Sequence, residues 1–140
     1  MHDNDVEISR VYTRLAKGVI ADITFASNEK CEIVVEAEAG ETVFKNGGPY
    51  IIGIAVHDLT DSKVEIHNFE EKANYQDAGK WDTQAYQKVF GPFSLEDVSG
   101  FTAIQGLHCF EVLAYVRSGK QDPDVSFAKS PTFAYFEGTR

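Results

Sequence analysis

Residues 107–116 read Leu107-His108-Cys109-Phe110-Glu111-Val112-Leu113-Ala114-Tyr115-Val116. Every second residue from Phe110 to Val116 is apolar, and the alternate positions include Glu111 and Arg117. This period of two, in a run rich in β-branched and aromatic residues, is typical of a strand with one buried face. Residues 118–124 include the Gly, Asp and Pro that are typical of a loop, and apolar residues resume from 125 to 136. The sequence from 106 to 136 therefore predicts a long β-hairpin.

Strand patterns also occupy residues 19–25, 30–39, 50–59, 63–69 and 89–95. Within 30–39, glutamates alternate with apolar residues, which predicts one face in the core and one in water. Residues 50–59 hold apolar side chains on both faces, which is typical of a strand in the middle of its sheet. Gly53 in this run indicates either a bulge or a close backbone approach.

Residues 4–17 predict a short helix. Their apolar residues fall at i, i+3, i+4 and i+7 and form one stripe, namely Ile8, Val11, Tyr12 and Leu15. Asn4 with Glu7 resembles a capping box, and Gly18 can end the helix. An edge strand is the alternative for this segment.

Seven or eight strands with short connections, without alternation of strands and helices, predict an all-β protein. We expect one antiparallel β-sandwich domain over residues 1–140, with the helix at 4–17 and the sandwich at 19–137. The hairpin at 106–136 resembles the last two strands of immunoglobulin and fibronectin type III domains. This resemblance implies a sandwich that is immunoglobulin-like in broad architecture. The tyrosine corner of immunoglobulin domains is absent, because Leu107 stands two residues before Cys109.

Composition disfavours several classes of partner. The chain of 140 residues has a net charge of −9, which repels nucleic-acid phosphates and anionic membrane surfaces. No apolar run approaches the roughly 20 residues that a membrane span needs, so we expect no membrane insertion. Residues 1–5 are polar and acidic, unlike a secretory signal. We therefore expect a cytoplasmic protein if the chain is full-length, and an extracellular location stays open for a mature form or an excised domain.

The two cysteines, Cys31 and Cys109, lie in different predicted strands. Either a disulfide joins facing sheets, as in extracellular sandwiches, or both are free thiols. Cys109 shares its strand parity with Glu111 and Arg117 rather than with Phe110, which favours the free thiols.

A polar sheet face is the first candidate site. If residues 60–62 form a three-residue hairpin loop, Val56 pairs with Ile66, and three polar side chains gather on one face: His57, Glu65 and His67. Two imidazoles and a carboxylate can bind a divalent metal such as zinc, although cross-strand His–Glu pairs are also routine on surfaces. The acidic turns at 58–61 and 122–124 are a second candidate, for calcium. We expect no obligatory cofactor.

Residues 70–88 show neither period, and a structureless loop of this length in a compact domain is often functional. Aromatic rings beside amides and carboxylates can stack on a sugar ring or anchor a peptide. The predicted ligand-binding residues are Asn74, Tyr75, Trp81, Asp82 and Tyr86. In the alternative interpretation, Trp81 and the tyrosines fold back over the edge of the core.

No common catalytic signature is present, whether G-x-S-x-G, a phosphate-binding Gly-rich loop or H-E-x-x-H. Neighbouring residues of a strand point to opposite faces, so His108 cannot activate Cys109, and we predict no catalytic residues. The sequence favours a non-catalytic binding module that recognises a protein or carbohydrate through residues 70–88. The alternatives are an oligomeric assembly subunit, whose contact the apolar residues 133–136 can supply, and a small metal-dependent enzyme.

Overall fold

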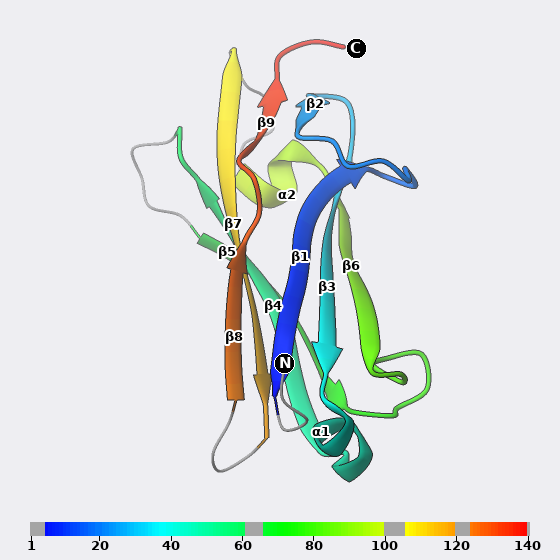
Figure 1. The fold of residues 1–140 in the computed structure, drawn as a ribbon. Coiled ribbons are helices and arrows are strands. Elements are labelled where there is room, and N and C mark those ends of the chain that lie inside the picture. Colours follow the sequence, from blue (N-terminus) through cyan, green and yellow to red (C-terminus); the bar gives the residue numbers. More distant parts are fainter. Residues whose placement is uncertain (1–4, 61–65, 100–105, 120–123, 140) are drawn as a thin grey trace.

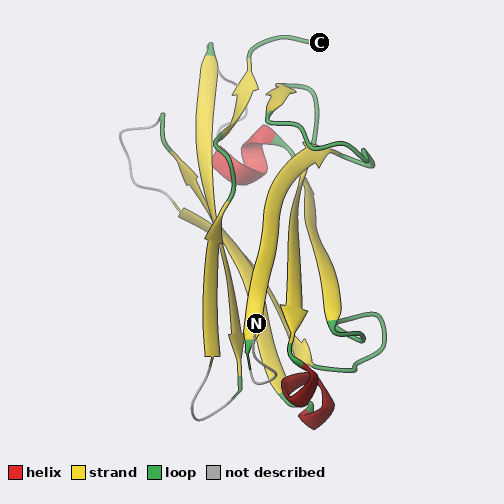
Figure 2. Cartoon of the chain, in the orientation of Figure 1, coloured by secondary structure: helices red, strands yellow, loops and turns green. Residues whose placement is uncertain are grey.

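The structure is a computed structural model that describes residues 5–60, 66–99, 106–119 and 124–139. Its strands are β1 (Val6–Leu15), β2 (Thr24–Ala26), β3 (Cys31–Ala39), β4 (Pro49–Asp58), β5 (Ile66–Asn74), β6 (Ala85–Phe93), β7 (Leu107–Ser118), β8 (Asp124–Lys129) and β9 (Phe133–Phe136). Two short helices, α1 (Glu41–Asn46) and α2 (Leu95–Ser99), connect strands (Figures 1 and 2). The chain is therefore mostly β-structure, as the sequence predicts.

The strands form two sheets. The smaller sheet has the order β1-β3-β6, and the larger has the order β2-β9-β7-β4-β5, with β8 also paired to β7 (Figure 1). All pairs are antiparallel except β2 with β9. The larger sheet confirms the hairpin at 106–136, whose second strand is interrupted between β8 and β9. It also confirms the central position of β4, which pairs with β5 on one side and with β7 on the other.

A single apolar core lies between the two sheets. The alternating residues predicted to be internal are buried, with Ile33 and Val35 from β3 and Phe110, Val112 and Val116 from β7 all inaccessible to solvent. The predicted faces of these two strands are therefore correct. Cys31 is buried, Cys109 is partly exposed, and both are free thiols.

The predicted N-terminal helix is wrong, because residues 6–15 form strand β1. A register shift between Ile8 and Arg10 marks a bulge at Ser9. The bulge moves the buried face by one residue, so the buried positions are Val6 and Ile8 before it and Val11 after it. The spacing of three between Ile8 and Val11 thus imitates a helical stripe within a strand.

The predicted strand at 19–25 is also wrong over most of its length, since only Thr24 and the two residues after it belong to a strand. The chain turns back at Lys17, which has a left-handed φ of 63°. The Thr13 hydroxyl donates a hydrogen bond to the Asp22 carbonyl, and the Asp22 amide donates to the Thr13 carbonyl. Val19 and Ile20 lie in the turn between these bonds, 90% and 78% exposed.

The predicted hairpin register between β4 and β5 is wrong by one residue. Val56 pairs with His67, and His57 pairs with Ile66. A shift of one residue moves every side chain of a strand to the other face, so the polar set predicted for one face is divided. The segment 70–88 is also more regular than predicted, because β5 extends to Asn74 and β6 begins at Ala85.

Side chains join the edges of the two sheets. On one side, the amides of Val6 and Ile8 in β1 donate to Asp124 Oδ2 (2.8 Å) and Ser126 Oγ (3.3 Å) in β8. On the other side, the Tyr86 hydroxyl of β6 donates to Glu71 Oε2 of β5 at 2.7 Å. No helix in the described parts of the chain is long and apolar enough to cross a membrane.

Candidate functional site

The aromatic residues predicted to bind a ligand form a buried cluster with Tyr50 of β4. Ring centroids lie 5.2 Å apart for Tyr50 and Trp81, 5.1 Å for Tyr75 and Trp81, and 5.4 Å for Trp81 and Tyr86. Trp81 is fully buried, and its indole Nε1 donates to the Gln84 carbonyl at 3.0 Å. The rings fold back over the core edge, which was the alternative interpretation of this segment, and the Trp81 ring presents no face to solvent.

Glu71 anchors this cluster as a buried carboxylate. Its Oε2 accepts hydrogen bonds from the hydroxyls of Tyr50 (2.9 Å) and Tyr86 (2.7 Å), and its Oε1 lies 3.4 Å from Lys88 Nζ and 3.5 Å from Lys80 Nζ. Burial by itself raises the pKa of Glu71, but the two phenols and Lys88 outweigh burial and the net pKa is lowered. Burial, followed by the hydrogen bond to Glu71, raises the pKa of both tyrosines. The cluster closes the β5–β6 edge of the sandwich.

The other residues predicted to bind a ligand are dispersed around this cluster. Tyr75 is buried and donates to Ser118 Oγ at 2.9 Å, and Tyr86 is half-buried. Asn74 is exposed at the end of β5, and Asp82 is exposed within the loop that leads to β6. Ligand binding by this segment stays a prediction, with its aromatic residues engaged in the fold.

The predicted metal-binding residues do not share a face. Because Val56 is an internal residue, the register places His67 on the inner side of the sheet and His57 on the outer side. Glu65 lies outside the described residues, as do Asp61 and Asp122 of the acidic turns. Asp58 and Asp124 lie near opposite ends of β7, beside Phe110 and Ser118 respectively. Within the described ranges, no three His, Cys, Asp or Glu side chains are close enough to hold a metal ion.

Asp58 and His108 form a pair at the other end of β4. The buried Asp58 lies with Oδ2 3.3 Å from His108 Nδ1, and its Oδ1 accepts from the Thr60 amide at 2.9 Å. Thr60 Oγ1 in turn accepts from the Cys109 amide at 2.7 Å. Cys109 projects from the opposite face of β7, so the pair holds the turn after β4 rather than activating the thiol.

A feature that the sequence reasoning missed lies on the solvent side of the larger sheet. We call this side of β8, β7, β4 and β5 the outward face. It consists of Ile51, Gly53, Ala55 and His57 from β4, Ile66, Asn68, Glu70 and Lys72 from β5, Glu111, Leu113, Tyr115 and Arg117 from β7, and Val125, Phe127 and Lys129 from β8. Three large apolar side chains on it are exposed, namely Ile66 (53%), Val125 (44%) and Phe127 (64%).

The centre of the outward face is a row formed by Glu70, Gly53, Tyr115 and Phe127. The Tyr115 ring lies directly over Gly53, and a Cβ on Gly53 would be 2.5 Å from Tyr115 Cζ. Burial, followed by the charge of Glu70, raises the pKa of Tyr115 to about 12. β4 has no register shift at Gly53, so this glycine marks a close approach and not a bulge.

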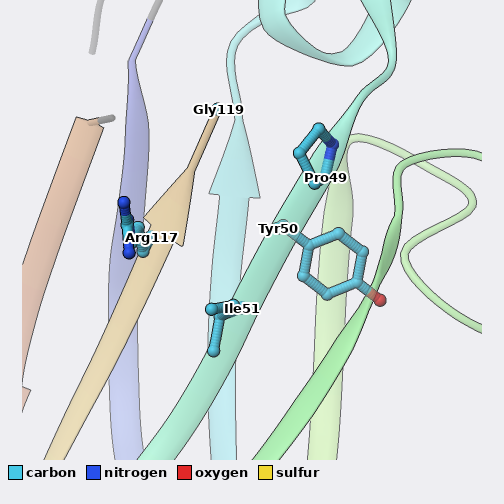
Figure 3. Close-up of a pocket in the computed structure, with 5 residues that line it drawn as sticks. All are labelled: Pro49, Tyr50, Ile51, Arg117 and Gly119. Carbon is cyan, nitrogen blue, oxygen red and sulfur yellow. The ribbon is translucent and has the colours of Figure 1, made fainter. Parts of the chain in front are cut away.

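Two shallow hollows lie at opposite ends of β4. One, of about 210 Å³, is lined by Ala55, His57, Ile66, Glu111, Leu113 and Lys129. The other, of about 270 Å³, is lined by Pro49, Tyr50, Ile51, Arg117 and Gly119 (Figure 3). Figure 3 shows Ile51 and Arg117 on neighbouring strands, with the Tyr50 ring pointing away from them. The outward face is therefore uneven and mixes apolar with charged side chains.

The turn at 17–23 is a second exposed apolar feature. Val19, Ile20 and Ile23 are all at least half exposed, and the turn lies beside the end of β1, far from the outward face (Figure 1).

A comparison with models of protein families and with curated proteins finds no match for this chain.

Proposed function

We propose that this chain is a non-catalytic interaction module that binds a protein through the outward face. The observation that carries the proposal is the exposure of Ile66, Val125 and Phe127 on one side of one sheet. An antiparallel sheet with one solvated face normally presents polar residues on that face. Contiguous exposed apolar surface on a folded domain marks an interaction site.

A protein partner suits this surface better than a carbohydrate. Sugar recognition was predicted from Trp81, and that ring is buried. The middle of the outward face is formed by Gly53, Ala55, Leu113 and Tyr115. Its margins combine the exposed apolar side chains with charged ones, including Glu111, Lys129 and Arg117. An apolar centre with a polar rim is the usual arrangement of a protein–protein contact.

We propose further that the sandwich is immunoglobulin-like. The order β1-β3-β6 in one sheet corresponds to strands A, B and E, and the order β4-β7-β8 in the other corresponds to C, F and G. β5 lies beside β4 rather than beside β6, which differs from the constant-type arrangement. The two free thiols support a reducing compartment, and we propose the cytoplasm.

Lysine acylation tests the proposed contact surface. Lys129 on the outward face and Lys45 on α1 are closely matched, with side chains 68% and 70% exposed and each paired with a glutamate. The chain is labelled in dilute purified form and in an extract of the cells that express it, and modification is measured by mass spectrometry. We expect labelling of Lys129, but not of Lys45, to fall in the extract. Equal labelling of Lys129 in both samples contradicts the proposal.

A further inference from the structure

We infer that the free edge of β5 pairs with β5 of a second copy of this chain, antiparallel and about a twofold axis. The larger sheets of the two copies then continue into one another. This inference goes beyond the proposed function, because it concerns a strand edge and not the outward face. It follows from the state of the other strand edges and from the residues that β5 presents at its own edge.

The other edges of the two sheets are covered or interrupted. At β1, the amides of Val6 and Ile8 donate to side chains of β8, which lies beside it. β2 has only three residues, and its amides of Thr24 and Ala26 donate to carboxylates of the same chain at 3.1 and 2.7 Å. β6 contains Pro92, which has no amide hydrogen to donate. Such features hinder the addition of a further strand.

β5 is an edge strand without these features. It has nine residues, contains no glycine or proline, and pairs with β4 without a register shift. The Tyr75 amide donates to the Gly48 carbonyl, so alternate residues of β5 bond to β4 and the residues between them point away from it. The residues that point away are Ile66, Asn68, Glu70 and Lys72. Within the described parts of the chain, their four amides donate no hydrogen bond.

The open edge consists of residues 66–72. It ends there because the Asn74 amide donates to Asp77 Oδ2 at 3.1 Å and the Asn74 carbonyl accepts from the Asp77 amide at 3.2 Å. Phe69 is the middle residue of this stretch. Two antiparallel copies of the open edge therefore overlap completely only when Phe69 of one copy lies opposite Phe69 of the other.

The register centred on Phe69 places no like charges opposite one another. Asn68 of each copy lies opposite Glu70 of the other, where its side-chain amide can donate to the carboxylate, and Ile66 lies opposite Lys72. If the axis moved to Glu70 instead, this carboxylate would face its own copy, which destabilises a strand pair. The arrangement of charges along the edge thus favours the same register as its length.

The inner side of the edge supports the same pairing. Phe69 is only partly buried in one copy, with its ring centroid 4.5 Å from that of Phe93. Its copy across the axis would cover the exposed part, and a cross-strand aromatic pair is stabilising. His67 lies opposite Glu71 in this register. Because the contact uses the same edge of both copies, it closes at a dimer.

Light scattering after size exclusion, over a series of concentrations, tests the pairing with the purified chain. We expect the mass to rise toward twice the 15.5 kDa of one chain. Asn68→Pro removes an amide that points away from β4, so it should preserve the fold. It should raise the dissociation constant at least about tenfold, because the hydrogen bond is lost twice in a twofold dimer. Gln87→Pro is the matched control, since this amide points to the free edge of β6.

Charge at position 68 tests the register without a change in the backbone. Opposite Glu70, Asn68→Lys should lower the dissociation constant and Asn68→Glu should raise it, each by about threefold or more. Gln87→Lys and Gln87→Glu are the controls for the change in net charge. Circular dichroism verifies the fold of every variant, and if Asn68→Pro does not fold, the two charge variants decide the edge.

Three results would overturn the inference. The first is a chain that stays monomeric into the millimolar range, and the second is a dimer that Asn68→Pro weakens no more than Gln87→Pro. The third is an effect of the same sign from Asn68→Lys and Asn68→Glu, relative to their controls, which refutes the register. The proposed function is tested separately, because Lys129 lies on β8, and β7 and β4 separate β8 from β5.

Discussion

Gly53→Ala tests whether the Tyr115 ring is the reason for a glycine in the central strand. The new Cβ would lie 2.5 Å from Tyr115 Cζ, so the ring must move about 1 Å to reach an ordinary contact of 3.4–4 Å. Overpacking of this kind costs about 1–3 kcal/mol, and the lower backbone entropy of alanine returns about 0.4–1 kcal/mol. Since φ of Gly53 is not left-handed, no backbone strain is added. We expect the free energy of unfolding to fall by about 1–2 kcal/mol.

The same substitution in a Tyr115→Ala background separates the ring from other causes. Without the ring, Gly53→Ala should be neutral or stabilise the protein by up to about 1 kcal/mol, which gives a coupling of about 2 kcal/mol between the two positions. Urea unfolding followed by the fluorescence of the buried Trp81 measures all four proteins. In the control, Tyr115→Phe keeps the ring, and Gly53→Ala should remain costly there. Additive effects within about 0.5 kcal/mol would refute the reasoning.

Two further predictions concern buried ionisable groups. Glu71→Gln should lower the free energy of unfolding by about 2–4 kcal/mol, because it leaves two phenols and Lys88 without their carboxylate. In the control, Glu41→Gln at the exposed pair with Lys45 should change the free energy of unfolding by less than about 0.5 kcal/mol. Equal effects of the two substitutions in urea unfolding contradict this account. Burial raises the pKa of Cys31 from 9.0 to about 11, so the unfolded chain loses this proton first and stability should fall by about 2–3 kcal/mol as pH rises through that interval. Cys31→Ala should make this decline shallower between pH 9 and 10, where the tyrosines contribute the same slope to both proteins, and an unchanged slope argues against the assignment.

The alternation of apolar and polar residues along single strands predicted the core. A bulge and a turn caused the errors in the remaining elements. The faces of β3 and β7 followed directly from their period of two. The same reasoning failed in β1, because the bulge at Ser9 inserts one residue and gives the strand the apolar spacing of a helix. Val19 and Ile20 have strong strand propensity, yet the hydrogen bonds between Thr13 and Asp22 hold them in a turn.

The candidate site was harder to predict than the core. The register of β5 depends on the loop after β4, and an error of one residue separated His57 from His67. The sequence left two interpretations of Trp81 open, and only its contacts with Tyr50 and Tyr75 distinguish a ring that covers the core edge from a ring that binds a ligand. The outward face had a weak signal, since Leu113 and Tyr115 occupy the positions of β7 that alternation assigns to solvent.

The side-chain bonds between sheet edges bear on how this chain avoids aggregation. Unpaired strand edges are templates on which further chains add without limit. Here the amides of Val6 and Ile8 in β1 donate hydrogen bonds to side chains of β8. At the opposite side, the hydrogen bond from Tyr86 to Glu71 joins β6 to β5. The bonds from β1 occupy two backbone amides that a further strand would need, whereas the bond from Tyr86 to Glu71 joins side chains and fixes β5 beside β6. Asp124 and Ser126 thus protect the edge of β1 from the addition of a further strand. This role accounts for a charged and a polar residue in β8 that the apolar core does not require.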